Sequence, residues 1–137
     1  MTHPFSGGCL CGDVRYECKS APAFAYYCHC TDCQKASGTA FHTGLLVSRD
    51  DFTVTSGEAK TWSRPSDAGN TVTHAFCGNC GAQLYVYSSA GPERLSIKAG
   101  SLDDTSWIKP ELQIWTQSEV PWSKTDQATE HFSQGRK

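Results

Sequence analysis

The feature that most constrains this chain is its eight cysteines, seven of which lie in three close groups. The groups are Cys9 and Cys11, then Cys28, Cys30 and Cys33, then Cys77 and Cys80, with Cys18 alone. A disulfide within Cys9-Leu10-Cys11 or Cys28-His29-Cys30 would be strained, because the bridge needs a particular Cα separation and dihedral angle. Bridges between groups remain an alternative. We expect zinc sites, because closely spaced cysteines in a reducing compartment are more often metal ligands.

The local spacing within the groups suits zinc. The stretch "CGNCG" at 77–81 has the form of a zinc knuckle, in which a two-residue gap lets both sulfurs face one ion. Gly78 and Gly81 allow the positive φ angles that such a loop often requires. The stretch "CHCTDC" at 28–33 supplies three further soft ligands from six residues, one short of the four that zinc prefers.

Counting ligands favours one division of the groups into two sites. Joining Cys9 and Cys11 to Cys77 and Cys80 makes a closed four-sulfur site and leaves Cys28, Cys30 and Cys33 with an open position. A closed site is typical of structural zinc, and three protein ligands with an open position are typical of catalytic zinc. Other divisions take two sulfurs from the triplet and leave a pair or a single cysteine unused. An unrecognised protein ligand could also close the triplet and make it structural.

The sequence predicts a mainly β protein with little helix. Short runs rich in β-branched and aromatic residues predict strands at 11–18, 40–48, 52–57, 71–76, 83–88, 94–100 and 112–115. Turn signals occur at 56–58, 64–70 and 88–93, residues 31–37 could form one helical turn after a Thr31-Asp32 cap, and 101–110 suggests a turn or short helix. In the first run Val14, Tyr16 and Cys18 share a face, so we expect Cys18 to be buried and inert. One domain should span residues 1–137, with its motifs within 7–122 and a polar, frayed or lightly docked tail at 123–137.

Charge and hydropathy exclude two classes of partner. The net charge is −2 and the basic residues are scattered, which argues against a nucleic-acid-binding zinc ribbon. No apolar run approaches the length that spans a membrane. The N-terminus "MTHPFSGGCLCG" lacks the basic lead and apolar stretch of a signal peptide, so we expect a cytoplasmic protein.

Five motifs occur in the order seen in a known family. "GGCLCGDVRYE", "CHCTDCQKASG", "HAFCGNCGAQLY", "GSLDD" and "PELQIW…PW" together resemble the glutathione-dependent formaldehyde-activating enzyme (GFA) family, or CENP-V/GFA domain. The match runs from Gly7 to Trp122. One departure is Gln113, which stands where the family leads us to expect a histidine.

The resemblance implies a fold, a metal content and an activity. The fold would be Mss4-like, with short antiparallel strands held by two Zn²⁺ ions per chain. A structural zinc would bind Cys9, Cys11, Cys77 and Cys80, and the catalytic zinc would bind Cys28, Cys30 and Cys33. The activity would be that of a carbon–sulfur lyase resembling S-(hydroxymethyl)glutathione synthase, with a thiol such as glutathione and a small aldehyde as substrates.

The chemistry of an open three-thiolate site agrees with that activity. Such a site is soft and suited to a fourth sulfur, which would bind as thiolate and could attack an aldehyde carbon. His29, His42 and His74 are candidates for handling the proton, although each also has a structural interpretation. We expect the aromatic set to be mostly core, with one or two members lining a pocket: Phe24, Tyr26, Tyr27, Trp107, Trp115 and Trp122. The alternative function is a zinc-stabilised module that binds glutathione or a protein without turnover.

Overall fold

Short strands dominate the structure, a computed structural model that describes residues 4–124, 129–134 and 136. The strands are β1 (Phe5–Gly8), β2 (Arg15–Cys18), β3 (Phe24–Cys28), β4 (His42–Ser48), β5 (Phe52–Ser56), β6 (Ala59–Pro65), β7 (Thr71–Cys77), β8 (Gln83–Ser88), β9 (Arg94–Lys98) and β10 (Pro110–Ile114). The helical elements are α1 (Thr31–Ser37) and the short 3₁₀ turns η1 (Arg49–Asp51), η2 (Ala99–Ser101) and η3 (Thr116–Ser118). The predicted mainly β class with little helix is confirmed. Within the described ranges, every helix is too short or too polar to cross a membrane.

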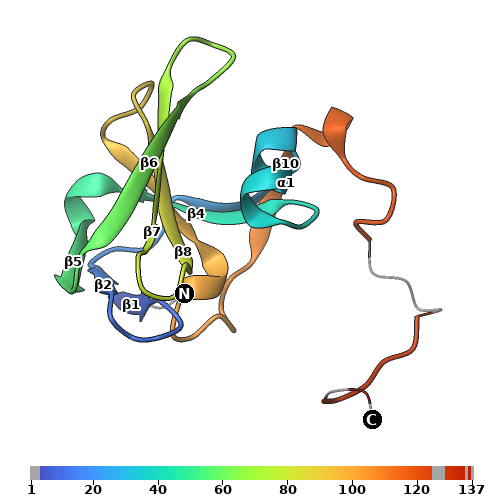
Figure 1. Ribbon diagram of the computed structural model, residues 1–137, viewed down its shortest axis with the longest axis horizontal. Coiled ribbons are helices and arrows are strands. Elements are labelled where there is room, and N and C mark those ends of the chain that lie inside the picture. Colours follow the sequence, from blue (N-terminus) through green and yellow to red (C-terminus); the bar gives the residue numbers. More distant parts are fainter. Residues whose placement is uncertain (1–3, 125–128, 135, 137) are drawn as a thin grey trace.

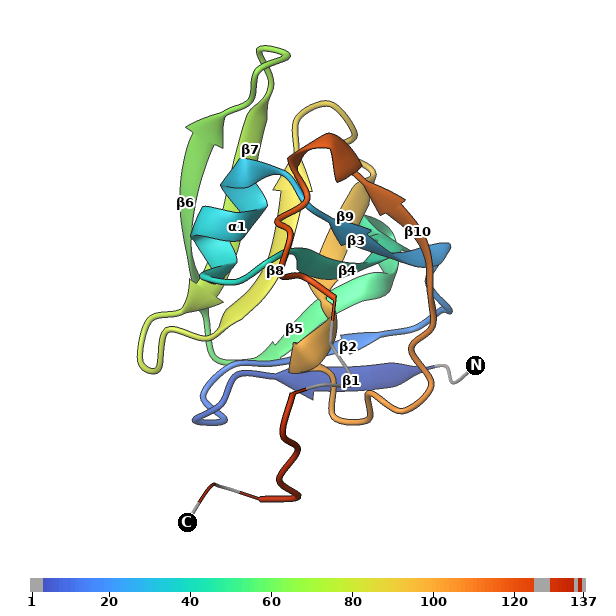
Figure 2. The ribbon, with the colours of Figure 1, turned by 90° about the vertical axis from the view of Figure 1, so that its right-hand side faces the viewer.

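The strands form two sheets. The smaller sheet has the order β1-β2-β5, and the larger has the order β10-β3-β4-β9-β8-β7-β6 (Figure 1). Neighbouring strands run antiparallel except for β10, which pairs parallel with β3 and sets Ile114 opposite Cys28. Helix α1 lies against one face of the larger sheet, and the smaller sheet lies below it (Figure 2).

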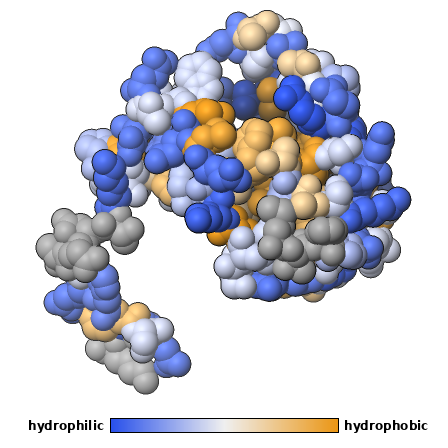
Figure 3. Space-filling model, turned by 180° about the vertical axis from the view of Figure 1, so that it is seen from behind, coloured by the Kyte–Doolittle hydropathy of each residue, from blue (hydrophilic) through white to orange (hydrophobic). Residues whose placement is uncertain are grey.

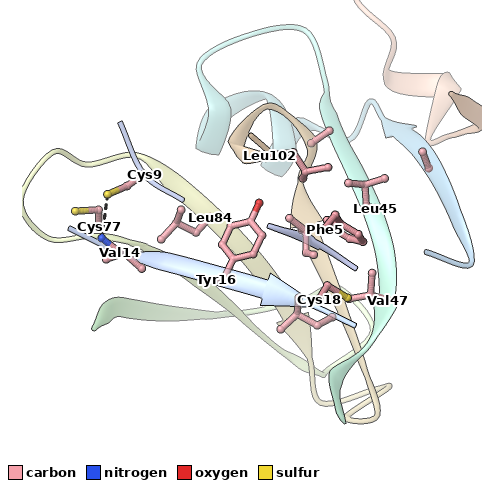
Figure 4. Close-up of a cluster of buried hydrophobic side chains, with 14 residues drawn as sticks. Phe5, Cys9, Val14, Tyr16, Cys18, Leu45, Val47, Cys77, Leu84 and Leu102 are labelled. Carbon is pink, nitrogen blue, oxygen red and sulfur yellow. Dashed lines mark hydrogen bonds between the residues drawn. The ribbon is translucent and has the colours of Figure 1, made fainter. Parts of the chain in front are cut away.

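The hydrophobic core lies where β2 meets the larger sheet. Its buried members include Val14, Tyr16, Cys18, Leu45, Val47, Leu84, Leu95 and Ile97. The alternation in the run 11–18 correctly predicts that Val14, Tyr16 and Cys18 share the buried face. Cys18 is fully buried and lies apart from Cys9 and Cys77 (Figure 4). Burial raises the pKa of the Cys18 thiol, which agrees with an inert role.

Several predicted element boundaries are wrong. The run at 11–18 is a strand only from Arg15, because Gly12 at φ 85° makes a turn and Cys9 N–H bonds to Val14 C=O at 3.0 Å. Strands β1, β3 and β6 were not predicted. The segment 101–110, by contrast, contains a turn, one of the two predicted alternatives, in which the Ile108 N–H bonds to the Thr105 C=O at 3.2 Å. Strand β10 ends before Trp115, whose φ of 59° is left-handed.

The C-terminal segment leaves the sheets after η3. Residues 129–134, all exposed, lie away from the sheets (Figure 1). Residues 125–128, 135 and 137 of the predicted tail lie outside the described residues.

Seen from behind, hydrophobic residues lie together near the middle of one face, among mostly hydrophilic ones (Figure 3).

Candidate metal centre

The structure gathers two of the cysteine groups into one cluster, which we name the four-cysteine cluster. The sulfurs of Cys9, Cys11, Cys77 and Cys80 lie within 4.8 Å of one another. The Sγ atoms of Cys9 and Cys11 are 3.6 Å apart, and those of Cys11 and Cys77 are 3.8 Å apart. All eight cysteines of the chain are free of disulfide bonds.

Two turns from different sheets present these sulfurs. Cys9 and Cys11 lie between β1 and β2 of the smaller sheet, whereas Cys77 ends β7 of the larger sheet. The sulfurs of Cys9 and Cys77 lie side by side at one end of the core (Figure 4). A metal ion held here would therefore tie the two sheets together.

Donor groups in these turns point at the sulfurs. The Val14 N–H donates to Cys9 Sγ at 3.2 Å, and the Asn79 N–H donates to Cys77 Sγ at 3.4 Å. The Asn79 side-chain amide donates to Cys11 Sγ at 3.3 Å. Hydrogen bonds from N–H groups stabilise thiolates. The backbone N–H groups of Ala82 and Cys11 donate to Cys80 and hold its pKa at about 6. The turns are thus suited to ionised sulfur.

Only one of the two knuckle glycines has the predicted positive φ angle. Gly81 has φ 79°, as expected for the residue that closes such a turn. Gly78 does not have a positive φ. A Cβ at Gly78 would lie 2.7 Å from Lys60 Cδ, so a larger residue here would require the flexible Lys60 side chain to shift.

The remaining group, which we name the triplet, is Cys28, Cys30 and Cys33. Their sulfurs lie within 4.8 Å of one another, and no fourth His, Cys, Asp or Glu among the described residues joins them. Cys28 ends β3, Cys30 precedes α1 and Cys33 lies in its first turn.

Helix α1 begins differently from the prediction. Cys30 is the N-cap residue, and its Sγ accepts the Cys33 N–H at 3.2 Å, so Thr31 and Asp32 are already helical. The helix ends at Gly38, with φ 73°. A cysteine can act as the cap because its sulfur takes the place of a side-chain oxygen as acceptor. The turn that starts the helix therefore also brings two triplet sulfurs together.

The triplet thiols interact strongly with one another. A hydrogen bond from the Cys33 thiol holds the pKa of Cys28 at about 6. The same interaction, together with burial, raises the pKa of Cys33. One member of the group is therefore readily ionised, which is the form that binds metals.

The ring nitrogens of His29 do not join the triplet sulfurs. Its ring is 1% exposed, its Nε2 lies 2.8 Å from Gln113 Oε1, and Phe41 packs against it with ring centroids 5.2 Å apart. Its Nδ1 has no hydrogen-bond partner among the described protein atoms. His29 thus packs in the interior, and Gln113 on β10 holds it in place.

His42 lies below the triplet on β4, opposite Cys28 in the sheet register. Its Nδ1 is 3.1 Å from Lys98 Nζ, and its Nε2 is 3.3 Å from Tyr26 Oη and 3.4 Å from Ser96 Oγ. Burial and the Lys98 charge lower the pKa of His42 to about 3. The ring is therefore neutral and accepts a hydrogen bond from the Lys98 ammonium.

His74 on β7 has a similar environment. The Arg64 Nε–H donates to His74 Nε2 at 3.1 Å, and Trp62 stacks on the ring with centroids 4.5 Å apart. Burial and the Arg64 charge lower the pKa of His74 to about 4. Arg64 also pairs with Asp32 of α1 at 3.0 Å, which links the helix to β6.

Two cavities of about 330 Å³ each open on the larger sheet. One is lined in part by Ala36, Trp62, His74, Gln83, Tyr85 and Lys98. The other is mostly apolar, and its lining includes Phe24, Tyr26, Leu46, Val86, Leu112 and Ile114. Of the aromatic residues expected in the core, Trp115 and Trp122 are instead 52% and 66% exposed.

Sequence reasoning missed three polar residues around the triplet: Arg64, Gln83 and Lys98. Gln83 donates to the Ala36 carbonyl of α1, and Lys98 and Arg64 hold the two histidines. The one available signal was the run "RLSIK", where Lys98 alternates with Ser96 and Arg94 on one face.

Comparisons with known proteins agree with this arrangement. The family model described as glutathione-dependent formaldehyde-activating enzyme matches residues 4–118. A crystal structure of a Rhodobacter sphaeroides protein, solved as a structural genomics target, is similar with a TM-score of 0.61 and 21% sequence identity. The alignment covers 79% of this chain and 97% of that chain, and it supports the fold alone. With its cysteine groups assembled and most of its length matched, the chain belongs to the glutathione-dependent formaldehyde-activating enzyme (GFA) family.

Proposed function

We propose that this protein is a carbon–sulfur lyase that makes and breaks the bond between a thiol sulfur and an aldehyde carbon, with glutathione and a small aldehyde as substrates. The observation that carries the proposal is the triplet, three sulfurs within 4.8 Å that no fourth ligand joins among the described residues. Membership of the GFA family supports a formaldehyde-activating role at the level of the family.

We propose two zinc ions per chain, a structural one at the four-cysteine cluster (Cys9, Cys11, Cys77 and Cys80) and a catalytic one at the triplet (Cys28, Cys30 and Cys33). Thiolates are preferred zinc ligands, and the N–H donors aimed at sulfur support ionised cysteines in both groups. At the triplet, bound zinc would supply a soft centre that stabilises an incoming thiol as thiolate.

The reaction balances without a redox partner. In the synthetic direction the thiol sulfur bonds to the aldehyde carbon, the carbon–oxygen double bond becomes single, and the proton lost by the thiol ends on the new hydroxyl. His42 and His74 are neutral and accept hydrogen bonds from Lys98 and Arg64. We assign these rings to positioning the two cations, and His29 to packing.

We also propose a cellular compartment and a domain organisation for this protein. Clustered cysteines without bridges favour a reducing environment, so we propose the cytoplasm. We also keep one domain over residues 1–137, since both sheets contribute to one core.

The competing function is a zinc-stabilised module that binds glutathione or a protein without turnover. NMR exchange spectroscopy on formaldehyde, glutathione and their adduct separates the two. A lyase should accelerate exchange at a protein concentration far below that of substrate, and Cys33→Ser should abolish the acceleration. A carrier should only shift populations in proportion to its own concentration, and that result would overturn the proposal.

A further inference from the structure

Lys98 is a largely buried cation without a carboxylate partner in the described part of the chain. The ion pairs found there involve Arg15, Arg64 and Arg94. The hydrogen bond of Lys98 Nζ goes to the neutral His42 Nδ1 at 3.1 Å. Burying an ammonium costs free energy unless an opposite charge compensates it. A negative charge near Lys98 is therefore to be expected.

The hydrogen-bonded neighbours of His42 fix the position of Lys98. Tyr26 Oη lies 2.6 Å from Ser96 Oγ, and both face His42 Nε2. Because Nδ1 accepts from the ammonium, Nε2 carries the ring proton and donates to this pair. Gly44 leaves the space that they need, since a Cβ there would lie 2.6 Å from His42 Nε2 and collide with Ser96 Oγ.

The sheet register directs Lys98 toward the triplet. Lys98 on β9 pairs with Gly44 on β4, which pairs with Tyr26 on β3, two residues before Cys28. Lys98 also lines the cavity that contains Ala36 of α1. Burial lowers the pKa of Lys98, and negative charge on the three triplet cysteines opposes that shift. The register and these charges together make the triplet a source of negative charge near Lys98.

The charge of the triplet makes such a cation useful. Three thiolates around a divalent ion leave a net charge of about −1, and a fourth thiolate would bring it to about −2. The negative charge already present in a partly desolvated site opposes binding of the fourth thiolate, whereas a nearby cation favours it.

We propose that Lys98, held by His42, Ser96 and Tyr26, is the charge-compensating residue that lets the triplet accept an anionic thiolate as its fourth ligand. Lys98 acts through the triplet and does not touch the reacting atoms, so its role is positioning and electrostatic. This inference rests on the proposed function.

The test compares an anionic and a neutral ligand on the same site. Glutathione and imidazole are each titrated into cobalt-substituted protein, and the thiolate-to-cobalt absorption is followed. Lys98→Met should weaken glutathione binding about tenfold or more and move its pH profile upward by about one unit, while imidazole binding changes less than about twofold. Lys98→Arg should restore most of the glutathione affinity. Lys35→Met, which removes an exposed charge on α1, should behave as wild type.

The possible results separate the two proposals. Equal loss of glutathione and imidazole binding in Lys98→Met would make Lys98 merely structural. Unchanged binding of both would remove its role while leaving the lyase proposal intact. A wild-type protein that binds no thiol would overturn the open site and this inference together. If Lys98→Met does not fold, Lys98→Gln keeps a polar group at the position and serves for the same titrations.

Discussion

The two histidines near α1 show how single residues set the electrostatics of this molecule. Each imidazole is buried and accepts a hydrogen bond from a cation, Lys98 for His42 and Arg64 for His74. The cations and burial together hold both rings neutral, with pKa values of about 3 and about 4. Protonating either ring would place two positive charges side by side.

His74 should make the protein less stable in mild acid. Its pKa is about 4 when folded, and an unperturbed histidine has a pKa of about 6.5, so between these values the unfolded state binds the extra proton. Titration of His74 should therefore lower the free energy of unfolding by up to about 1.4 kcal/mol per pH unit as pH drops from about 6.5 toward 4, and His42, with a folded pKa of about 3, should add a similar slope. Denaturant titrations between pH 7 and 4.5 measure this slope.

The matched variant for that experiment is His74→Gln, whose side-chain oxygen can still accept from Arg64. Its pH dependence should be shallower than that of wild type, and zinc content is measured in both to separate loss of metal from titration of the ring. Parallel slopes in the two proteins would show that His74 does not titrate as described.

Gly44 should tolerate no side chain. A Cβ at this position would collide with Ser96 Oγ and lie 2.8 Å from Tyr26 Cε1, so Gly44→Ala forces the polar network around His42 apart. We expect a loss of about 1–3 kcal/mol in the free energy of unfolding, measured by denaturant titration. Gly100→Ala is the control, because a Cβ there meets nothing within 4 Å. Equal stability of the two variants would contradict the close packing.

At the scale of elements, α1 depends on its neighbours for its position. The helix has seven residues and none of them is buried, so neither propensity nor packing can hold it alone. Instead the Gln34 side-chain amide donates to the His29 carbonyl at 2.8 Å and to the Ser118 carbonyl at 2.9 Å. The geometry of the triplet therefore depends on hydrogen bonds that reach from α1 to the residue after β3 and to η3.

Gln34→Ala should loosen the triplet more than it destabilises the fold. Removing both hydrogen bonds should cost about 1–3 kcal/mol, and the freed helix start should release its metal faster. Zinc loss from the reconstituted protein under a chelator, followed over time, measures the effect. Lys35→Ala changes the adjacent exposed residue and should keep the wild-type rate. The same rate in both variants would show that Gln34 does not hold the site.

A strand could be predicted from the sequence when the residues of the strand itself carry a β pattern. The strands β5, β7, β8 and β9 have dense β-branched or aromatic residues and were predicted within two residues of their observed ends. Strand β6 is an exposed edge strand that carries Lys60, Arg64 and Pro65, so it gives no burial pattern to find. The parallel pairing of β10 with β3 joins residues more than 80 positions apart, and no local pattern encodes it.

Some residues of the candidate site could likewise be predicted from local sequence, and others could not. The cysteine groups could be predicted because metal ligands must be close in space and most are close in sequence. The roles of Lys98, Arg64 and Gln34 could not be predicted, because they depend on which elements are neighbours in the fold. Lys98 reaches the triplet only through the register of β9 on β4 and β4 on β3.

At the scale of the whole molecule, the two cysteine groups have unequal structural consequences. The four-cysteine cluster joins residues 9 and 11 to residues 77 and 80 and connects the two sheets. The triplet collects its ligands within six residues of one another and connects only β3 to α1. Closing a long loop restricts the unfolded chain more than closing a short one.

Substitution should separate the two groups clearly. A structural zinc contributes about 10–16 kcal/mol of apparent binding free energy in small domains, whereas a whole domain is stable by about 5–15 kcal/mol. Cys77→Ser should therefore leave little net stability and give unfolded or insoluble protein. Cys33→Ser should lose one zinc per chain and any activity, but keep β-type circular dichroism and a cooperative melt. Metal analysis and thermal unfolding on the same preparations measure both.

Cys18→Ala is the control, because Cys18 is buried outside both groups and should keep the zinc content of wild type. Its cost in stability should be that of a small core cavity, about 1–2 kcal/mol. If Cys33→Ser unfolds as readily as Cys77→Ser, the triplet is structural and the lyase proposal fails. If Cys77→Ser instead folds with the zinc content of wild type, no metal ion connects the two sheets, and their stability must come from the shared core alone.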